Sequence, residues 1–266
     1  MVNYTDATVL VTGAASGIGA ALAMQLGERG ARVICADRDS EGLANTVAGI
    51  GGGATAITSD LSDPGAAAAL IEQSFALSNR LDLVCSNAGL GRAGSVLDED
   101  IDNAPAVSRL FEVNFFAGLK IAQAYGRRLA DNGQRGRLMV TASENSLSLP
   151  SAVKQSKMAL YGATKHALLI AMEWMRIDPK FANMDLHVLM PGVVYTALTS
   201  PVLPNPADVP PEMGLIMPEQ CAEIALRGMD HDLFYIPTHP HFIDDMQPRL
   251  SEIEVAMTTL NITNKA

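Results

Sequence analysis

The sequence has few of the features that mark membrane, exported or nucleic-acid-binding proteins. No apolar run in its 266 residues reaches the roughly 18 needed to span a bilayer. The first residues, MVNYTDATVLVTG, have neither the basic stretch nor the long apolar stretch of a signal peptide. Only 19 basic residues stand against 29 acidic ones, and the resulting net charge of −10 would repel phosphate backbones. We therefore expect a cytoplasmic protein that binds neither membranes nor nucleic acid.

Cysteine and aromatic residues are scarce as well. The three cysteines, Cys35, Cys85 and Cys221, form no close pair in the sequence, which indicates reduced thiols rather than a disulfide framework. Aromatic residues make up 5% of the chain, whereas hydrophobic residues of all kinds make up 48%. Such a chain can bury a large core, but its composition does not indicate a function.

Short apolar runs alternate with segments of helical spacing along the chain. The pattern predicts strands at 7–11, 32–36, 54–58, 81–86, 137–141, 185–190 and 233–236, and helices at 17–29, 40–50, 64–78, 104–131, 157–178 and 219–229. This alternation favours parallel strands joined by right-handed crossovers. We expect an α/β fold, a doubly wound parallel sheet of about seven strands with helices on both faces, in a single domain spanning 1–266.

The segment at about 198–218 departs from this pattern. Its stretch SPVLPNPADVPPEMGLIMP holds six prolines and cannot form a regular helix. A long proline-rich loop in a compact domain often covers a site, so we interpret it as a substrate lid. Met213, Ile216 and Met217 in this segment either line an apolar pocket or anchor the loop.

Three glycines lie between the first expected strand and the first expected helix. Gly13, Gly17 and Gly19 would let the backbone turn sharply and approach a pyrophosphate, which the free N–H groups at a helix start favour. The spacing G-x-x-x-G-x-G is a variant of the dinucleotide-binding pattern. Alone it is weak, because glycine-rich turns also serve chain geometry only.

Asp37 ends the second expected strand, 18 residues after Gly19. A carboxylate in this place can bind both hydroxyls of an adenosine ribose and would repel a 2′-phosphate. The neighbouring Arg38 could instead accommodate such a phosphate, and Asp37 could simply cap the following turn. The bare carboxylate, with no basic residue in the glycine turn, favours NAD over NADP.

Five motifs occur in an order that resembles the short-chain dehydrogenase/reductase family. They are Thr12–Gly19, Asp60-Leu61, Asn87-Ala88-Gly89, Tyr161-x-x-x-Lys165 and Pro191-Gly192, and the resemblance covers about residues 5–200. Each motif is common, but together they are specific. The resemblance implies a Rossmann-type fold, an oxidoreductase activity and an oligomer, a dimer or tetramer.

The resemblance also implies the contacts to the cofactor. Asp60 would contact the adenine, Asn87-Ala88-Gly89 would border the cofactor, and the Val194 backbone and Thr196 hydroxyl would reach the nicotinamide carboxamide. The expected cofactor-binding residues are Gly13, Ser16, Gly17, Ile18, Gly19, Asp37, Arg38, Asp60, Leu61, Asn87, Ala88, Gly89, Tyr161, Lys165, Pro191, Gly192, Val194 and Thr196.

Tyr161 and Lys165 are the expected centre of the chemistry. Four residues apart on a helix, they lie on one face. A free tyrosine has a pKa near 10, and a nearby ammonium favours its phenolate. Tyr161 would then accept the proton of a substrate alcohol, and Lys165 would also bind the nicotinamide ribose. The spacing by itself would equally suit an ordinary Tyr–Lys contact.

The resemblance adds a serine and an asparagine to this pair. Ser143 follows the fifth expected strand, where the family places the serine that binds the substrate oxygen. The usual spacing to the tyrosine would select Ser148 instead; we prefer Ser143 because strand ends fix positions better than loops. Asn114 matches the family's helix asparagine, which links to Lys165 through a bound water.

These residues predict an NAD-dependent enzyme acting on a mostly apolar secondary alcohol or ketone. The alternative is a catalytically silent NAD(H)-binding sensor or scaffold on the same fold. No metal site is expected, because His231, His239 and His241 lack a recognised zinc spacing. We interpret those histidines as surface or subunit-contact residues.

Overall fold

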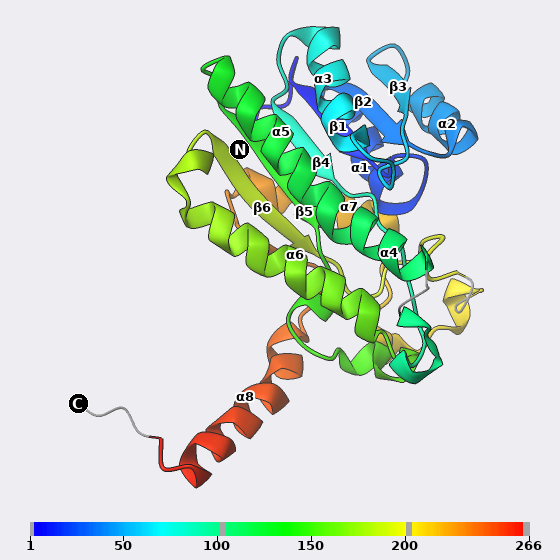
Figure 1. Ribbon diagram of the computed structural model, residues 1–266. Helices are drawn as coiled ribbons and strands as arrows, with labels where there is room; N and C mark the ends of the chain where they lie inside the picture. Colours follow the sequence, from blue (N-terminus) through cyan, green and yellow to red (C-terminus); the bar gives the residue numbers. More distant parts are fainter. Residues whose placement is uncertain (1–2, 102–104, 201–203, 263–266) are drawn as a thin grey trace.

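Seven parallel strands form one sheet in the computed structural model, which describes residues 3–101, 105–200 and 204–262 (Figure 1). The strands lie in the order β3-β2-β1-β4-β5-β6-β7. Their bounds are β1 Thr8–Thr12, β2 Arg32–Asp37, β3 Ala54–Thr58, β4 Leu83–Ser86, β5 Gly136–Thr141, β6 Met184–Met190 and β7 Tyr235–Pro237. The chain reverses its direction of travel across the sheet between β1 and β4, and ligands of such sheets bind at that switch point.

Helices cover both faces of this sheet, and each face has its own apolar core. One face carries α1 (Gly17–Glu28), α2 (Ser40–Ile50) and α7 (Pro218–Asp230). The other carries α3 (Ala66–Ser78), α4 (Pro105–Phe111), α5 (Ala117–Asp131) and α6 (Ala159–Ile177) (Figure 1). β1, β4 and β5 are buried along almost their whole length because side chains of both faces pack under helices. The predicted fold class, a doubly wound parallel sheet of seven strands in one domain, is confirmed.

The helix expected at 104–131 contains an irregular turn. After α4 the chain makes a π-helical turn, Glu112–Phe116, before it continues as α5. The residue in the middle of this turn is Asn114. Such a turn inserts one residue into the helix and is frequent at functional sites.

Some element boundaries differ from the prediction. The helix expected to begin at Pro64 begins at Ala66, because Gly65 takes a left-handed conformation with φ 79° as its N-cap. β4 begins two residues later than expected, and β7 runs over 235–237 rather than 233–236. In the proline-rich segment, residues 204–217 form two short 3₁₀ turns, Pro206–Asp208 and Pro211–Met213, and no α-helix.

The last helix, α8 (Phe242–Thr259), was not expected from the sequence. It extends away from the sheet and its covering helices (Figure 1), and Phe242 is its one buried residue. A proline inside it, Pro248, and a sparse apolar pattern conceal its helical period. Its first turns nevertheless lie against the segment that carries Ser143, as described below.

The cysteines and histidines occupy different surroundings. Burial raises the pKa of each of the three free thiols to about 12, so the cysteines are unreactive core residues. The prediction of surface histidines is wrong for His239, which is 6% exposed.

In the described ranges, no set of His, Cys, Asp or Glu side chains is placed to hold a metal ion. Nor does any helix of those ranges have the length and apolar character that crossing a membrane requires.

Candidate active site

The glycine turn joins β1 to α1 with almost no free space. Gly13 has φ +68°, and a Cβ there would lie 2.9 Å from the Ala88 Cα. A Cβ on Gly19 would lie 2.0 Å from the Gly13 carbonyl oxygen. The turn brings backbone N–H groups to the start of a helix, which is a favourable place for a pyrophosphate. The geometry therefore fits a dinucleotide phosphate.

We predict that Gly19→Ala weakens NADH binding at least about tenfold, equivalent to about 1.4 kcal/mol. The new methyl group must displace the Gly13 carbonyl and with it the phosphate-binding turn. Titration of NADH fluorescence measures the affinity. Gly52→Ala is the matched control, because no atom lies within 4 Å of its Cβ position. Equal affinities of the two variants would contradict this role of the turn.

Asp37 stands at the end of β2, directly beside the glycine turn. Its Oδ2 accepts a hydrogen bond from the Ala15 N–H at 3.1 Å, and its Oδ1 accepts one from the Asp39 N–H at 3.0 Å. The carboxylate is thus fixed at the strand end, next to Arg38 at the rim of the cavity. Farther along the rim, Asp60 forms an ion pair with Arg109, a residue that the sequence had not singled out.

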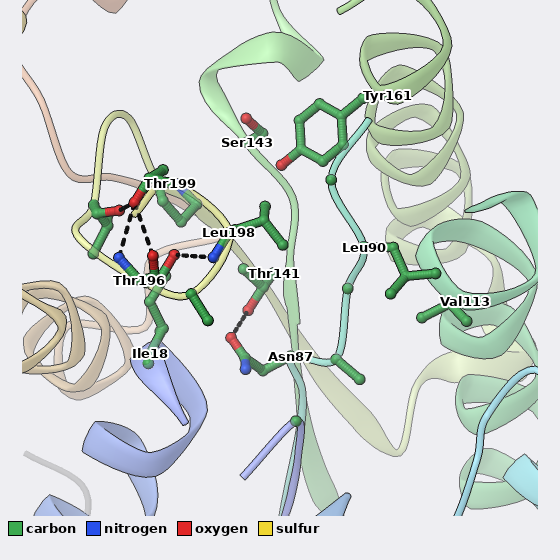
Figure 2. A pocket seen from close by; sticks show the side chains of 18 of the residues that line it. Ile18, Asn87, Leu90, Val113, Thr141, Ser143, Tyr161, Thr196, Leu198 and Thr199 are labelled. Atoms are coloured by element: carbon green, nitrogen blue, oxygen red, sulfur yellow. Dashed lines mark hydrogen bonds between the residues drawn. The ribbon is translucent and has the colours of Figure 1, made fainter. Parts of the chain in front are cut away.

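Asn87 links the ends of three central strands. Its backbone N–H donates to the Thr12 hydroxyl at 3.0 Å, and its side-chain Oδ1 accepts from the Thr141 hydroxyl at 3.0 Å (Figure 2). Its Nδ2 donates to the Thr12 carbonyl at 3.3 Å. These bonds tie β1, β4 and β5 together where the sheet meets the cavity.

Tyr161 and Lys165 lie on the buried face of α6. Figure 2 shows the phenol oxygen of Tyr161 directed toward Ser143. Burial raises the pKa of Tyr161 above its usual value, while the neighbouring Ser143 hydroxyl opposes this shift. The Lys165 Nζ lies 5.8 Å from the centre of the Tyr161 ring and donates to the Thr141 carbonyl at 2.7 Å. Burial lowers the pKa of Lys165 to about 8.

Ser143 begins the loop after β5 and lines the cavity. Its hydroxyl oxygen accepts from the Asn145 N–H at 3.2 Å and from the Asn145 amide at 3.3 Å. Ser148 is also buried, but it does not line the cavity. Of the two serines, Ser143 is therefore the one placed beside Tyr161.

Asn114 lies under the cavity in the π-helical turn. Its Oδ1 accepts from the Leu90 N–H at 2.7 Å, and its Nδ2 donates to the Leu90 carbonyl at 2.9 Å and to the Thr164 hydroxyl at 3.2 Å. A Cβ on Gly89 would be 3.5 Å from the Asn114 Oδ1 and 3.6 Å from the Lys165 Nζ. The amide and the ammonium thus flank the same glycine without a direct contact between them.

One cavity of about 940 Å³ connects these parts. Every predicted site residue lines it except Gly19, which acts through the shape of the turn, and Asn114, which lies beneath it. The proline-rich segment contributes Leu198 and Met213 to the walls. Ile216 instead pairs with Val194 and packs on the core, and Met217 is exposed. The loop Glu144–Met158, expected from the sequence to border the substrate, contributes Glu144 and Asn145 to the lining next to Ser143.

The walls of this cavity fit a nicotinamide dinucleotide. The glycine turn suits the pyrophosphate, Asp37 suits the adenosine ribose, and Tyr161 and Lys165 lie at the opposite end. Thr196 and Val194 also line the cavity, with the Thr196 side chain against the glycine turn at Gly17, and the Thr196 hydroxyl accepts from the Leu198 N–H at 3.2 Å (Figure 2). The fold and the site together define an oxidoreductase of the dinucleotide-binding α/β class.

Comparison with known proteins gives the family. The model of the family described as short chain dehydrogenase matches residues 7–207. A 1-deoxy-11-beta-hydroxypentalenate dehydrogenase of Streptomyces avermitilis is 35% identical over 256 residues, which cover 94% of this chain and 89% of the relative. The chain therefore belongs to the short-chain dehydrogenase/reductase family.

Solved structures of the same fold have bound either form of the cofactor. A short-chain dehydrogenase/reductase from Burkholderia phymatum in complex with NAD superposes with a TM-score of 0.83 at 21% identity, covering 96% of this chain and 97% of the other. One from Sphingobium yanoikuyae in complex with NADPH gives 0.74 at 22%, covering 98% and 97%. At these identities the likeness shows the fold alone.

Proposed function

We propose that the protein is an NAD-dependent dehydrogenase or ketone reductase for secondary alcohols. One observation carries this proposal: Ser143, Tyr161 and Lys165 line the same cavity as the glycine turn and Asp37. When bound, the nicotinamide dinucleotide supplies the hydride acceptor or donor. All other steps belong to side chains of this chain.

In oxidation, Tyr161 takes the hydroxyl proton of the substrate. Ser143 holds the substrate oxygen by a hydrogen bond, and Lys165 supports the phenolate by its charge. Burial of Tyr161 favours its neutral form, so the positive charges in the loaded site have to overcome this effect. Asn114 supports the site by holding the backbone of Leu90, a residue of the cavity wall, through two hydrogen bonds.

The cofactor preference is proposed from Asp37. Its carboxylate stands where a 2′-phosphate would meet a negative charge, and this supports NAD over NADP. Arg38 on the same rim supports the opposite choice, but the Asp37 carboxylate is anchored by two backbone N–H groups. A cytoplasmic location, in which NAD is available, is part of this proposal.

The substrate is proposed to be mostly apolar. Apolar side chains contribute to the cavity walls, among them Leu90, Val153, Leu198 and Met213. Two curated relatives support this choice by their names: the hydroxypentalenate dehydrogenase and a versicolorin reductase of Emericella nidulans, 32% identical over 191 residues. The loop at about 198–218 would cover the substrate as a lid.

A panel of secondary alcohols, cyclic, aryl, steroid and polyol, tests the proposal. Each alcohol is incubated with NAD or NADP at alkaline pH, and formation of reduced cofactor is followed by absorbance. We expect turnover of apolar alcohols with NAD in preference to NADP. Binding of NADH without turnover of any alcohol or ketone would instead indicate a sensor or scaffold.

We also propose a homo-oligomer, a dimer or tetramer. Three large apolar side chains on α6, Ile170, Trp174 and Ile177, are 52%, 66% and 69% exposed and follow helical spacing. Trp174→Glu is expected to convert the oligomer into smaller species in light scattering after gel filtration. Wild-type protein that elutes as a monomer at micromolar concentration would contradict the proposal.

A further inference from the structure

The segment at 238–249, which includes the start of α8, contacts three parts of the candidate site. The Thr238 hydroxyl accepts from the Gly192 N–H at 3.1 Å. The two ring nitrogens of His239 lie 2.7 Å from the Thr238 hydroxyl and 2.8 Å from the Gly214 carbonyl of the proline-rich segment. A segment outside the motifs of the family thus holds both the turn after β6 and the proposed lid.

Three further contacts of this segment reach the loop at 143–151, called here the Ser143 loop. The His241 Nε2 lies 2.8 Å from the Glu144 Oε2. The Ser151 N–H donates to the Asp245 Oδ1 at 3.2 Å, and the Arg249 guanidinium donates to the Leu147 carbonyl at 2.7 Å. His241 at the N-cap of α8, together with Asp245 and Arg249 in its first turns, therefore contacts three places of the loop that carries Ser143.

Glu144 is an unusual residue in this position. Its side chain is 4% exposed, it lines the cavity, and it directly follows Ser143. Buried carboxylates are costly unless they are paired, and His241 is the hydrogen-bonding partner that the structure provides. Asp245 also faces this histidine, with its Oδ2 3.8 Å from the His241 Nε2.

Glu144 and Tyr161 line the same cavity, and Ser143, which directly precedes Glu144, lies beside Tyr161. Burial raises the pKa of Glu144, and the hydrogen bond from His241 opposes that shift. Burial raises the pKa of Tyr161, the neighbouring Ser143 hydroxyl lowers it, and the negative charge of Glu144 raises it further. The charged and titratable groups around this point are Glu144, Lys165, His239, His241 and Asp245, with Arg249 and His166 at the Leu147 side of the loop.

We propose that Glu144 and His241 form a positioning pair that fastens the Ser143 loop to the start of α8 and keeps a carboxylate beside Ser143 and Tyr161. The pair acts on the reaction only through Ser143 and Tyr161, and it takes no part in proton or hydride transfer itself. This inference rests on the proposed roles of Ser143 and Tyr161, and it gives α8 a function in the site.

Amide hydrogen exchange tests the fastening. In the cofactor-free protein, His241→Ala is expected to speed exchange of peptides within 143–151 about tenfold, because the amides of Glu144, Ser146 and Leu147 are hydrogen-bonded in the folded loop. His231→Ala, at an exposed histidine after α7, is the matched control and should leave these peptides unchanged. Equal exchange in both variants would overturn the fastening role.

The titration of Tyr161 tests the electrostatic part. Nuclear magnetic resonance of tyrosine labelled with carbon-13 at Cζ, with Tyr161→Phe for assignment, follows the phenol directly. Glu144→Gln keeps the size of the side chain but removes its charge, so Tyr161 is expected to ionise at lower pH than in the wild type. Glu223→Gln, on the exposed side of α7, should not change the titration. An unchanged or higher value in Glu144→Gln would overturn this part.

Kinetics separate this inference from the proposed function. If the enzyme oxidises an alcohol, the pH profile of kcat/KM in Glu144→Gln should move in the same direction as the phenol titration. A purely structural role for Glu144 would lower activity without moving the profile, and that result contradicts the inference. The exchange and titration experiments need neither cofactor nor substrate. If the variants change exchange and titration as expected but the wild-type protein turns over no alcohol or ketone, only the proposed function is contradicted.

Discussion

Tyr161→Phe is expected to lower kcat for alcohol oxidation by about a thousandfold while leaving NADH affinity within about twofold of the wild type. The phenol oxygen, directed toward Ser143, is the group that accepts the substrate proton in this account (Figure 2). Its removal leaves the ring, and with it the packing of α6, in place. Steady-state kinetics and NADH titration on the same preparation measure both effects.

Tyr235→Phe provides the control for this prediction. The Tyr235 hydroxyl donates to the Glu173 Oε1 at 2.8 Å, and the residue does not line the cavity. We expect its loss to change kcat less than about threefold. If Tyr161→Phe retained more than a tenth of wild-type kcat, another group would have to be the base.

The second large effect is expected at the ribose end. Asp37→Asn should change the ratio of kcat/KM for NAD to that for NADP about a hundredfold toward NADP, because the carboxylate that repels a 2′-phosphate loses its charge. The amide keeps an acceptor for the Ala15 N–H, which limits damage to the glycine turn. Parallel kinetics with both cofactors give the ratio.

Asp63→Asn serves as the matched control, because Asp63 is exposed and does not line the cavity. It should leave the cofactor ratio unchanged. A wild-type enzyme that prefers NADP, or an Asp37→Asn variant with an unchanged ratio, would contradict the assignment of Asp37. Arg38 would then be the residue to replace next.

The sheet and most of the site could be predicted because they depend on short-range patterns. Buried parallel strands are continuous apolar runs, and most of the predicted site residues lie close to a strand end or a helix start that such runs define; Asn114 and Lys165, inside helices, are the exceptions. Ser143 illustrates this: its place at the end of β5 decides its position, whereas the length of the loop that follows varies. The catalytic and cofactor roles of these residues stay predictions that the experiments above test.

The parts that escaped prediction depend on contacts between distant segments. His241 and Glu144 are 97 positions apart, and nothing in either local sequence indicates the other. The sequence suggested a surface position for His239, yet its ring is buried, with its two nitrogens against the Thr238 hydroxyl and the Gly214 carbonyl. The π-helical turn at Asn114 replaces a stretch that reads as regular helix, and its shape follows from the hydrogen bonds to Leu90 and Thr164.

Direct hydrogen transfer is the central claim of this account, and isotope labelling tests it most directly. The best alcohol of the panel is deuterated at its carbinol carbon and incubated with the enzyme and NAD. The reduced cofactor, analysed by mass spectrometry, is expected to carry the deuterium, and the transfer should be lost in Tyr161→Phe. Reduced cofactor without deuterium, or no reduction with any alcohol or ketone tested, would contradict the proposed function.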